Sequence, residues 1–113
     1  IELDPDRIKQ ALAILIANAL RYTPADGSIS VNARRETDHL LIEVSDTGSG
    51  IALDDLPHVF ERFYRADKSR SRAGGGSGLG LAIAKSIIEA HAGTIEARSE
   101  VGQGTTMRIE LPI

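Results

Sequence analysis

The apolar positions in the first part of the chain recur at the spacing of an amphipathic helix. The stripe consists of Ile8, Ala11, Leu12, Leu15, Ile16, Ala19 and Leu20. Asp4 and Pro5 stand just before it, an N-cap residue followed by proline at the first helical position. Thr23-Pro24 follows it, and the residue before a proline disfavours helix. The pattern therefore predicts a helix that begins at Pro5 and ends near Arg21.

Four stretches alternate apolar and polar residues, which is typical of strands with one buried face. Their apolar members are Ile29, Val31 and Ala33; Leu40, Ile42 and Val44; Ile95 and Ala97; and Met107, Ile109 and Leu111. A polar link at Glu36-Thr37-Asp38-His39 joins the first two, and Gly102-Gln103-Gly104 joins the last two. We expect two hairpins, the second with strands at 94–99 and 105–111.

Two further helices are predicted between the hairpins. Leu53–Phe60 is a short candidate, and Leu79–His91 is a longer one with Ile83, Ile87 and Ala90 on one stripe and Ala92-Gly93 as its C-cap. Residues 65–78 are rich in Arg, Ser and Gly and show no apolar period. Such a stretch inside a compact domain is typical of a functional lid or a linker.

The order of the elements predicts the fold class. Strands that neighbour in sequence pair antiparallel in most cases, and the helices then cover one face of the sheet while the other face meets water. We expect an α/β (α+β) two-layer sandwich with a mixed, mostly antiparallel sheet. A chain of 113 residues suits a single domain, here 1–113.

Composition narrows the function classes. The net charge of −3 and an aromatic content of 4% argue against a nucleic-acid binder. There is no cysteine for a disulfide or thiolate site, and no apolar run of about 20 residues for a membrane span. The chain begins with Ile1 and shows no signal peptide. We expect a cytoplasmic domain excised from a longer protein, without membrane contact of its own, whose parent could carry a membrane anchor.

Two glycine motifs indicate the chemistry. Gly76-Ser77-Gly78-Leu79-Gly80-Leu81 ends the polar segment and opens a helix, where unpaired N–H groups and the helix dipole favour a bound anion. Asp46-Thr47-Gly48-Ser49-Gly50 follows a strand. Asp46 is in phase with Ile42 and Val44, so its carboxylate leaves the strand on the inward face. A phosphate-type cradle and an inward carboxylate together predict a nucleotide site.

The chain resembles the catalytic and ATP-binding domain of sensor histidine kinases, whose superfamily includes gyrase, the Hsp90 chaperones and MutL. The resemblance covers essentially the whole chain and implies the Bergerat ATP-binding fold. It rests on these motifs in this order: Asn18-Ala19, Asp46–Gly50, Val59-Phe60-Glu61-Arg62-Phe63-Tyr64-Arg65, the Gly76–Leu81 run, and Gly102-Gln103-Gly104-Thr105. One Gly motif alone is weak, but the ordered set is a strong signal.

The resemblance implies ATP and Mg²⁺ as cofactors and a role for each matched residue. Asp46 would bind the adenine amino group, Thr105 would support the base through water, and Asn18 would ligate Mg²⁺. Arg65 and Arg70, in an ATP lid at about 61–78, would reach the γ-phosphate and count with Asn18 as catalytic. The rest of the nucleotide site would comprise Arg21, Tyr22, Gly48, Gly50, Ile51, Tyr64, Gly76, Gly78, Leu79, Gly80 and Leu81.

The same resemblance implies the partners: a histidine-containing dimerisation domain of the same parent protein and a response regulator. Without its dimerisation helices the fragment is expected to be monomeric. None of His39, His58 and His91 precedes an acidic residue on a long helix, so the phosphoacceptor is expected elsewhere.

The main departure from the family pattern is in the predicted first helix. Ile14 stands one turn before Asn18, where the family has Asn and gyrase-like members have a catalytic Glu. A gyrase-like ATPase would need that carboxylate. A non-catalytic nucleotide-binding module remains an alternative to the kinase. At the level of single residues, Asn18 as a solvated polar residue and Asp46 as a turn former also remain alternatives.

Overall fold

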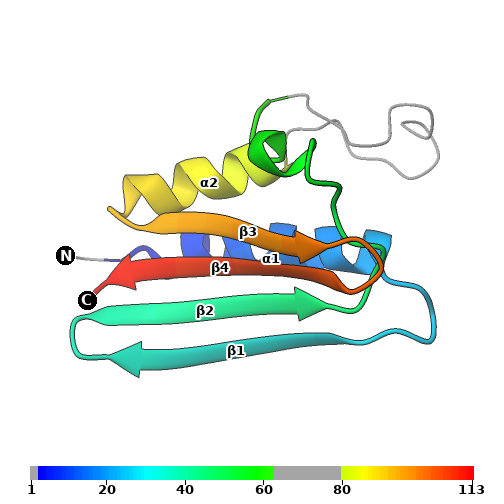
Figure 1. Ribbon diagram of the computed structural model, residues 1–113. Coiled ribbons are helices and arrows are strands. Elements are labelled where there is room, and N and C mark those ends of the chain that lie inside the picture. Colours follow the sequence, from blue (N-terminus) through cyan, green and yellow to red (C-terminus); the bar gives the residue numbers. More distant parts are fainter. Residues whose placement is uncertain (1–2, 63–79) are drawn as a thin grey trace.

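The computed structural model describes residues 3–62 and 80–113, which form two layers (Figure 1). A four-stranded sheet makes one layer and two helices make the other. The elements, in chain order, are α1 (Pro5–Tyr22), β1 (Ile29–Glu36), β2 (His39–Asp46), a 3₁₀ helix η1 (Leu56–His58), α2 (Gly80–Ala90), β3 (Thr94–Glu100) and β4 (Gly104–Pro112). The predicted two-layer sandwich is confirmed.

Helix α1 has the ends that the sequence predicts. The Asp4 carboxylate accepts hydrogen bonds from the backbone N–H groups of Asp6 and Arg7, at 3.1 and 3.3 Å. These N–H groups have no partner inside the helix, so the cap satisfies them. At the other end, Thr23 adopts an extended backbone before Pro24, and its hydroxyl donates to the Ala19 carbonyl at 2.7 Å.

The sheet has the strand order β1-β2-β4-β3, and all three neighbouring pairs are antiparallel. Among the described strands the sheet is therefore more uniform than the mixed sheet we expected. Both hairpins form as predicted. Because β4 enters between β2 and β3, the C-terminal end of β2 lies beside the start of β4, and this arrangement positions the candidate site.

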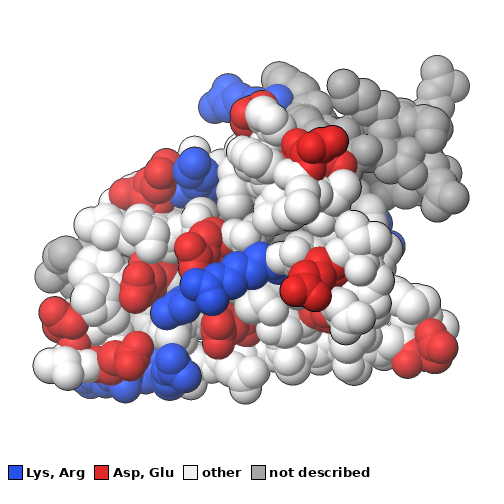
Figure 2. Space-filling model, viewed as in Figure 1, with Lys and Arg blue, Asp and Glu red and all other residues white. Residues whose placement is uncertain are grey.

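The core lies between the helices and one face of the sheet. Its buried side chains are Ala11, Leu15, Ala19, Ile42, Val44, Ala84, Ile87, Ile88, Met107, Ile109 and Leu111. The other face of the sheet carries charged side chains of both signs, interspersed rather than gathered by sign (Figure 2). Arg108, for example, lies opposite Glu43 on one neighbouring strand and Glu96 on the other. Such cross-strand pairs of opposite charge favour the register.

The predicted helix at Leu53–Phe60 is wrong in extent. Only Leu56–His58 is helical, as a 3₁₀ turn, and turns flank it. The Asp55 N–H donates to the Ala52 carbonyl, and the His58 N–H to the Asp55 carbonyl, both at 2.9 Å. Pro57 explains the difference, because it has no N–H to continue an α-helical ladder.

The C-terminal end of α2 lies where the sequence places it, but Ala92 rather than Gly93 takes the left-handed conformation, with a φ of 61°. The Gly93 N–H donates to the Ile88 carbonyl at 2.9 Å, which closes the last turn. Gly93 is needed for space, since a Cβ there would lie 2.5 Å from the Glu110 carbonyl oxygen.

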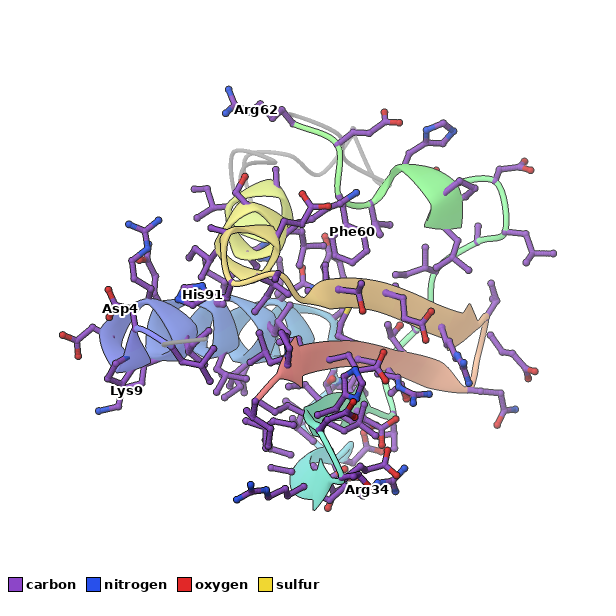
Figure 3. The ribbon with its side chains drawn as sticks, turned by 90° about the vertical axis from the view of Figure 1, so that its left-hand side faces the viewer. Asp4, Lys9, Arg34, Phe60, Arg62 and His91 are labelled. Atoms are coloured by element: carbon purple, nitrogen blue, oxygen red, sulfur yellow. The ribbon has the colours of Figure 1, made fainter. Side chains whose placement is uncertain are left out.

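His91 ties the end of α2 to the start of α1 (Figure 3). Its Nε2 accepts the Asp4 backbone N–H at 3.1 Å, so Nδ1 carries the proton and donates to the Ile87 carbonyl at 2.8 Å. The sequence pattern does not indicate this contact. No helix in the described part of the chain has the length and hydropathy to cross a bilayer.

Candidate functional site

Three polar side chains lie in one row across β2, β4 and β3. Asp46 is the register partner of Thr105, and Thr105 is the register partner of Ser99. Alternation places this row on the helix-covered face, in phase with the buried Val44 and Met107. Thr105 is only 8% exposed and Asp46 is half-buried. The inward register predicted for Asp46 is therefore confirmed.

The Asp46 carboxylate is held by the turn that follows it. Its Oδ1 accepts the Gly48 backbone N–H at 2.8 Å, which fixes the side chain at the strand end. A carboxylate offers about four lone-pair positions, so it keeps the capacity to accept further donors. Asp46 is thus oriented by the protein while most of its acceptor capacity is left for a ligand.

Three glycines let the backbone around Asp46 pack at distances that exclude a side chain. A Cβ on Gly104 would lie 2.0 Å from the Asp46 carbonyl oxygen, and one on Gly50 would lie 2.3 Å from the Glu100 carbonyl oxygen. One on Gly48 would lie 2.4 Å from the Tyr22 carbonyl oxygen. In the structure Gly48 and Gly50 let the backbone approach the protein's own backbone. Their close approach to a base stays a prediction.

The loop after β2 is held from both sides. On one side the Ser49 N–H donates to the Tyr22 carbonyl at 3.4 Å, which joins the loop to the end of α1. On the other side the Gly102 N–H donates to the Ser49 carbonyl at 2.9 Å, which joins it to the β3–β4 turn. Two residues after Ser49, Ile51 packs against the core and donates its N–H to the Ser99 hydroxyl at 2.7 Å.

The helix side of the site comes from α1 and the first residues of α2. Asn18 is half-buried, whereas Arg21 and Tyr22 are exposed in the last turn of α1. A Cβ on Gly80 would lie 3.3 Å from Ile14 Cγ2, so the start of α2 lies against α1 one turn before Asn18. The loop after β2, the β3–β4 turn and the end of α1 lie together at one end of the domain, and α2 runs away from that end, so its N-terminus faces it (Figure 1).

Part of the predicted site lies outside the described residues: Tyr64, Arg65, Arg70, Gly76, Gly78, Leu79 and all of the expected lid after Arg62. Phe60, just before this segment, is half-buried against the core (Figure 3). Lys85 Nζ lies 5.9 Å from the centre of the Phe60 ring, a cation–π distance that joins Phe60 to α2.

The described residues contain no group of three or more His, Cys, Asp or Glu side chains that could hold a metal. The open face of the sheet carries a polar hollow of about 200 Å³, lined by Thr94, Glu96, Arg108 and Glu110. Two carboxylates in that lining disfavour a phosphate there. The arrangement that suits a nucleotide is at the end of the domain that carries the Asp46 row and that the N-terminus of α2 faces.

Residues 3–113 match the model of one protein family, described as histidine kinase-, DNA gyrase B- and HSP90-like ATPases. The match covers nearly the whole chain and includes every element described above. The chain belongs to this family, as an ATP-binding catalytic domain of the sensor histidine kinase type.

Two bacterial sensor proteins are among its relatives. The chain is 48% identical over 114 residues to the sensor histidine kinase WalK of Bacillus subtilis (strain 168), an alignment that covers 99% of the chain and 19% of WalK. It is 46% identical over 109 residues to the sensor protein SrrB of Staphylococcus aureus (strain NCTC 8325 / PS 47), covering 96% of the chain and 19% of SrrB. The chain thus spans about a fifth of the length of these relatives.

Solved structures of histidine kinases share the fold of this chain. The mycobacterial sensor histidine kinase MprB superposes with a TM-score of 0.83 at 30% identity, over 96% of this chain and 74% of that one. A nucleotide-free catalytic domain of the histidine kinase ThkA superposes with a TM-score of 0.83 at 29% identity, over 99% and 71%. Full-length ShkA in complex with AMPPNP gives 0.81 at 33% identity, over 94% of this chain and 21% of ShkA.

Proposed function

We propose that this domain binds ATP together with Mg²⁺ and donates the γ-phosphoryl group to a histidine on a separate dimerisation domain of its parent protein. The observation that carries the proposal is the row of Asp46 and Thr105 beside glycines that admit no side chain. The ShkA complex with AMPPNP supports the nucleotide, because that protein shares this fold at 33% identity.

At the base end, Asp46 accepts a hydrogen bond from the adenine amino group. The Gly48 N–H holds one carboxylate oxygen, so the side chain keeps its direction before a ligand arrives. Thr105 lies next to it and supports the base through water. Such preorganisation lowers the ordering cost of binding.

At the phosphate end, N–H groups at the start of α2 and of the glycines before it receive the phosphates. Asn18 supplies a carbonyl oxygen to Mg²⁺, a hard cation that keeps several waters and needs few protein ligands. Mg²⁺ neutralises charge on the phosphates. Arg21 and Tyr22 line the ribose and phosphate side. The roles of Tyr64, Arg65, Arg70, Gly76, Gly78 and Leu79 in this proposal rest on the sequence motifs alone.

The proposed transfer of a phosphoryl group requires partners. The acceptor histidine lies on the dimerisation domain, a response regulator takes the phosphoryl group onward, and the fragment by itself is monomeric. Because ATP is the donor, the domain works on the cytoplasmic side. Elution of the fragment as a dimer in size-exclusion chromatography with light scattering would contradict the monomer.

Ile14 favours a second candidate, a nucleotide-binding module without transferase activity. Its side chain lies against the start of α2, at the phosphate end, and brings no polar atom there. Such a module would bind nucleotide and signal through the binding event alone.

Calorimetric titration with ADP and a non-hydrolysable ATP analogue, with and without Mg²⁺, tests the binding. We expect Mg²⁺-dependent binding that prefers the triphosphate. Asn18→Ala should remove the Mg²⁺ dependence, whereas Asn32→Ala, at an exposed position of β1, should not. Binding indifferent to Mg²⁺ in the unmodified domain would favour the second candidate.

Incubation with labelled ATP and the dimerisation domain of the parent protein separates the two candidates. The proposed kinase labels that domain on histidine, with a bond that is stable in base and labile in acid. Tight Mg²⁺–ATP binding without any transfer would leave the non-catalytic module as the function.

A further inference from the structure

The Ser99 hydroxyl contacts three groups at once. It lies 2.7 Å from the Ile51 backbone N–H, 2.8 Å from the Gly104 carbonyl oxygen and 2.9 Å from Thr105 Oγ1. These groups come from the loop after β2 and from the start of β4, so the half-buried Ser99 joins the two segments that frame Asp46.

The chemistry of a hydroxyl fixes the direction of all three hydrogen bonds. A serine hydroxyl has one proton to donate and two lone pairs to accept with. Ser99 donates its proton to the Gly104 carbonyl, because a carbonyl can only accept. It accepts the Ile51 N–H, which can only donate. The remaining lone pair takes the Thr105 hydroxyl proton, so Thr105 is the donor of the pair.

The Thr105 hydroxyl can therefore only accept a hydrogen bond from any further partner. Its register neighbour Asp46 is an acceptor as well, since a carboxylate has no proton to donate. The two side chains together present only acceptors to a ligand. Adenine meets them with its exocyclic amino group, directly or through a water, whereas guanine carries an acceptor oxygen at the equivalent ring position.

We propose that Ser99 is a positioning residue that fixes Thr105 as a hydrogen-bond acceptor beside Asp46, and that it thereby strengthens the preference for adenine over guanine. This inference rests on the proposed function, in which the Asp46 row receives the base. Ser99 acts through Thr105, so its effect on the base disappears when the Thr105 hydroxyl is absent.

A double-mutant cycle on the whole domain tests the inference. The variants are Ser99→Ala, Thr105→Val and the two combined, with dissociation constants measured by calorimetry for ADP and GDP. We expect Ser99→Ala to weaken ADP binding about 5- to 10-fold and GDP binding less than about 2-fold, the scale of one buried hydrogen bond. In the Thr105→Val background, Ser99→Ala should change ADP binding less than about 2-fold.

The domain offers a matched control on the other face of the same sheet. Ser45 and Thr106, also register partners, pair their hydroxyls at 3.0 Å and face away from the site. Ser45→Ala should leave both dissociation constants unchanged. Hydrogen exchange of the Ile51 amide gives a readout without nucleotide, because Ser99→Ala should accelerate it and Ser45→Ala should not.

Other outcomes overturn the inference. Equal loss of ADP and GDP binding, or independent effects of the two substitutions, would mean that Ser99 only holds the loop. If Ser99→Ala does not fold, Ser99→Cys keeps the size with a weaker hydrogen-bonding group, and the same comparison applies. Failure of the unmodified domain to bind ADP would instead refute the proposed function, which the cycle distinguishes from failure of the Ser99 role.

Discussion

Gly80, the first residue of α2, lies against Ile14 of α1, so that a Cβ on Gly80 would stand 3.3 Å from Ile14 Cγ2. An apolar side chain thus lies where the first N–H groups of α2 have no partner inside the helix. Ile14 also packs against the core. The position therefore favours packing over contact with a charged ligand.

Ile14→Asn should raise the affinity for Mg²⁺ and ATP several-fold, because an amide oxygen one turn before Asn18 adds a polar ligand at the phosphate end. It should also lower the free energy of unfolding by about 1–3 kcal/mol through lost apolar burial. Calorimetry and urea unfolding measure the two effects. Ile16→Asn, at another half-buried core contact of α1, is the control. It should destabilise the domain similarly without a gain in affinity.

Asp46→Asn should weaken binding of ATP more than binding of GTP, by about 1–3 kcal/mol for ATP, the size of a buried hydrogen bond that involves a charge. The Asn side chain keeps an oxygen for the Gly48 N–H, so the turn should stay intact. Competition binding with the two nucleotides measures the difference, and Asp54→Asn, at an exposed position, serves as control. Equal losses for ATP and GTP would show that Asp46 does not contact the base.

The alternation of apolar residues predicts both hairpins and the inward side of Asp46, because a strand places every second side chain on the same face. The same alternation also places Ser99 on the inward face of β3. It follows Ile95 and Ala97 at a spacing of two, yet a serine near a strand end looks like any solvated polar residue. Its importance comes from the pairing of β3 with β4, which the spacing alone does not reveal.

Contacts far apart in sequence set the features that the pattern does not predict. Most positions of α2 are apolar, so more than one stripe fits the pattern. The predicted stripe included Ile83, which is 41% exposed, while Ala84 and Ile88 are buried. The direction in which α2 packs on α1 and β3 decides between them. The Asp4–His91 contact joins residues 87 positions apart and has no local signal.

Gly104→Ala and Gly102→Ala should differ sharply in their effect on stability. Both glycines have positive φ, 121° and 84°. A Cβ on Gly104 would collide with the Asp46 carbonyl at 2.0 Å, whereas a Cβ on Gly102 meets nothing within 4 Å. Gly102→Ala should lower the free energy of unfolding by about 1–2 kcal/mol, from the left-handed backbone alone. Gly104→Ala should lower it by more than about 3 kcal/mol, because the strand end must move. Urea unfolding measures both, and similar losses would contradict the collision.

Ala92→Gly should stabilise the domain. Ala92 holds a φ of 61°, a conformation that costs a residue with a Cβ about 1–2 kcal/mol and glycine very little. Glycine also gains conformational freedom in the unfolded chain, which offsets part of the benefit. A net gain of about 0.5–1 kcal/mol in the free energy of unfolding is expected, measured by urea unfolding and by an upward shift of the melting temperature.

The control for this substitution is Ala13→Gly, at an exposed position in the middle of α1. The backbone there is helical, so glycine should lower the free energy of unfolding by about 1 kcal/mol. The two changes have the same chemistry and opposite expected signs, because only the backbone conformation of the alanine differs. If Ala92→Gly destabilised the domain as Ala13→Gly does, Ala92 would not hold a strained left-handed backbone in solution. The helix α2 would then end in a turn without a left-handed residue.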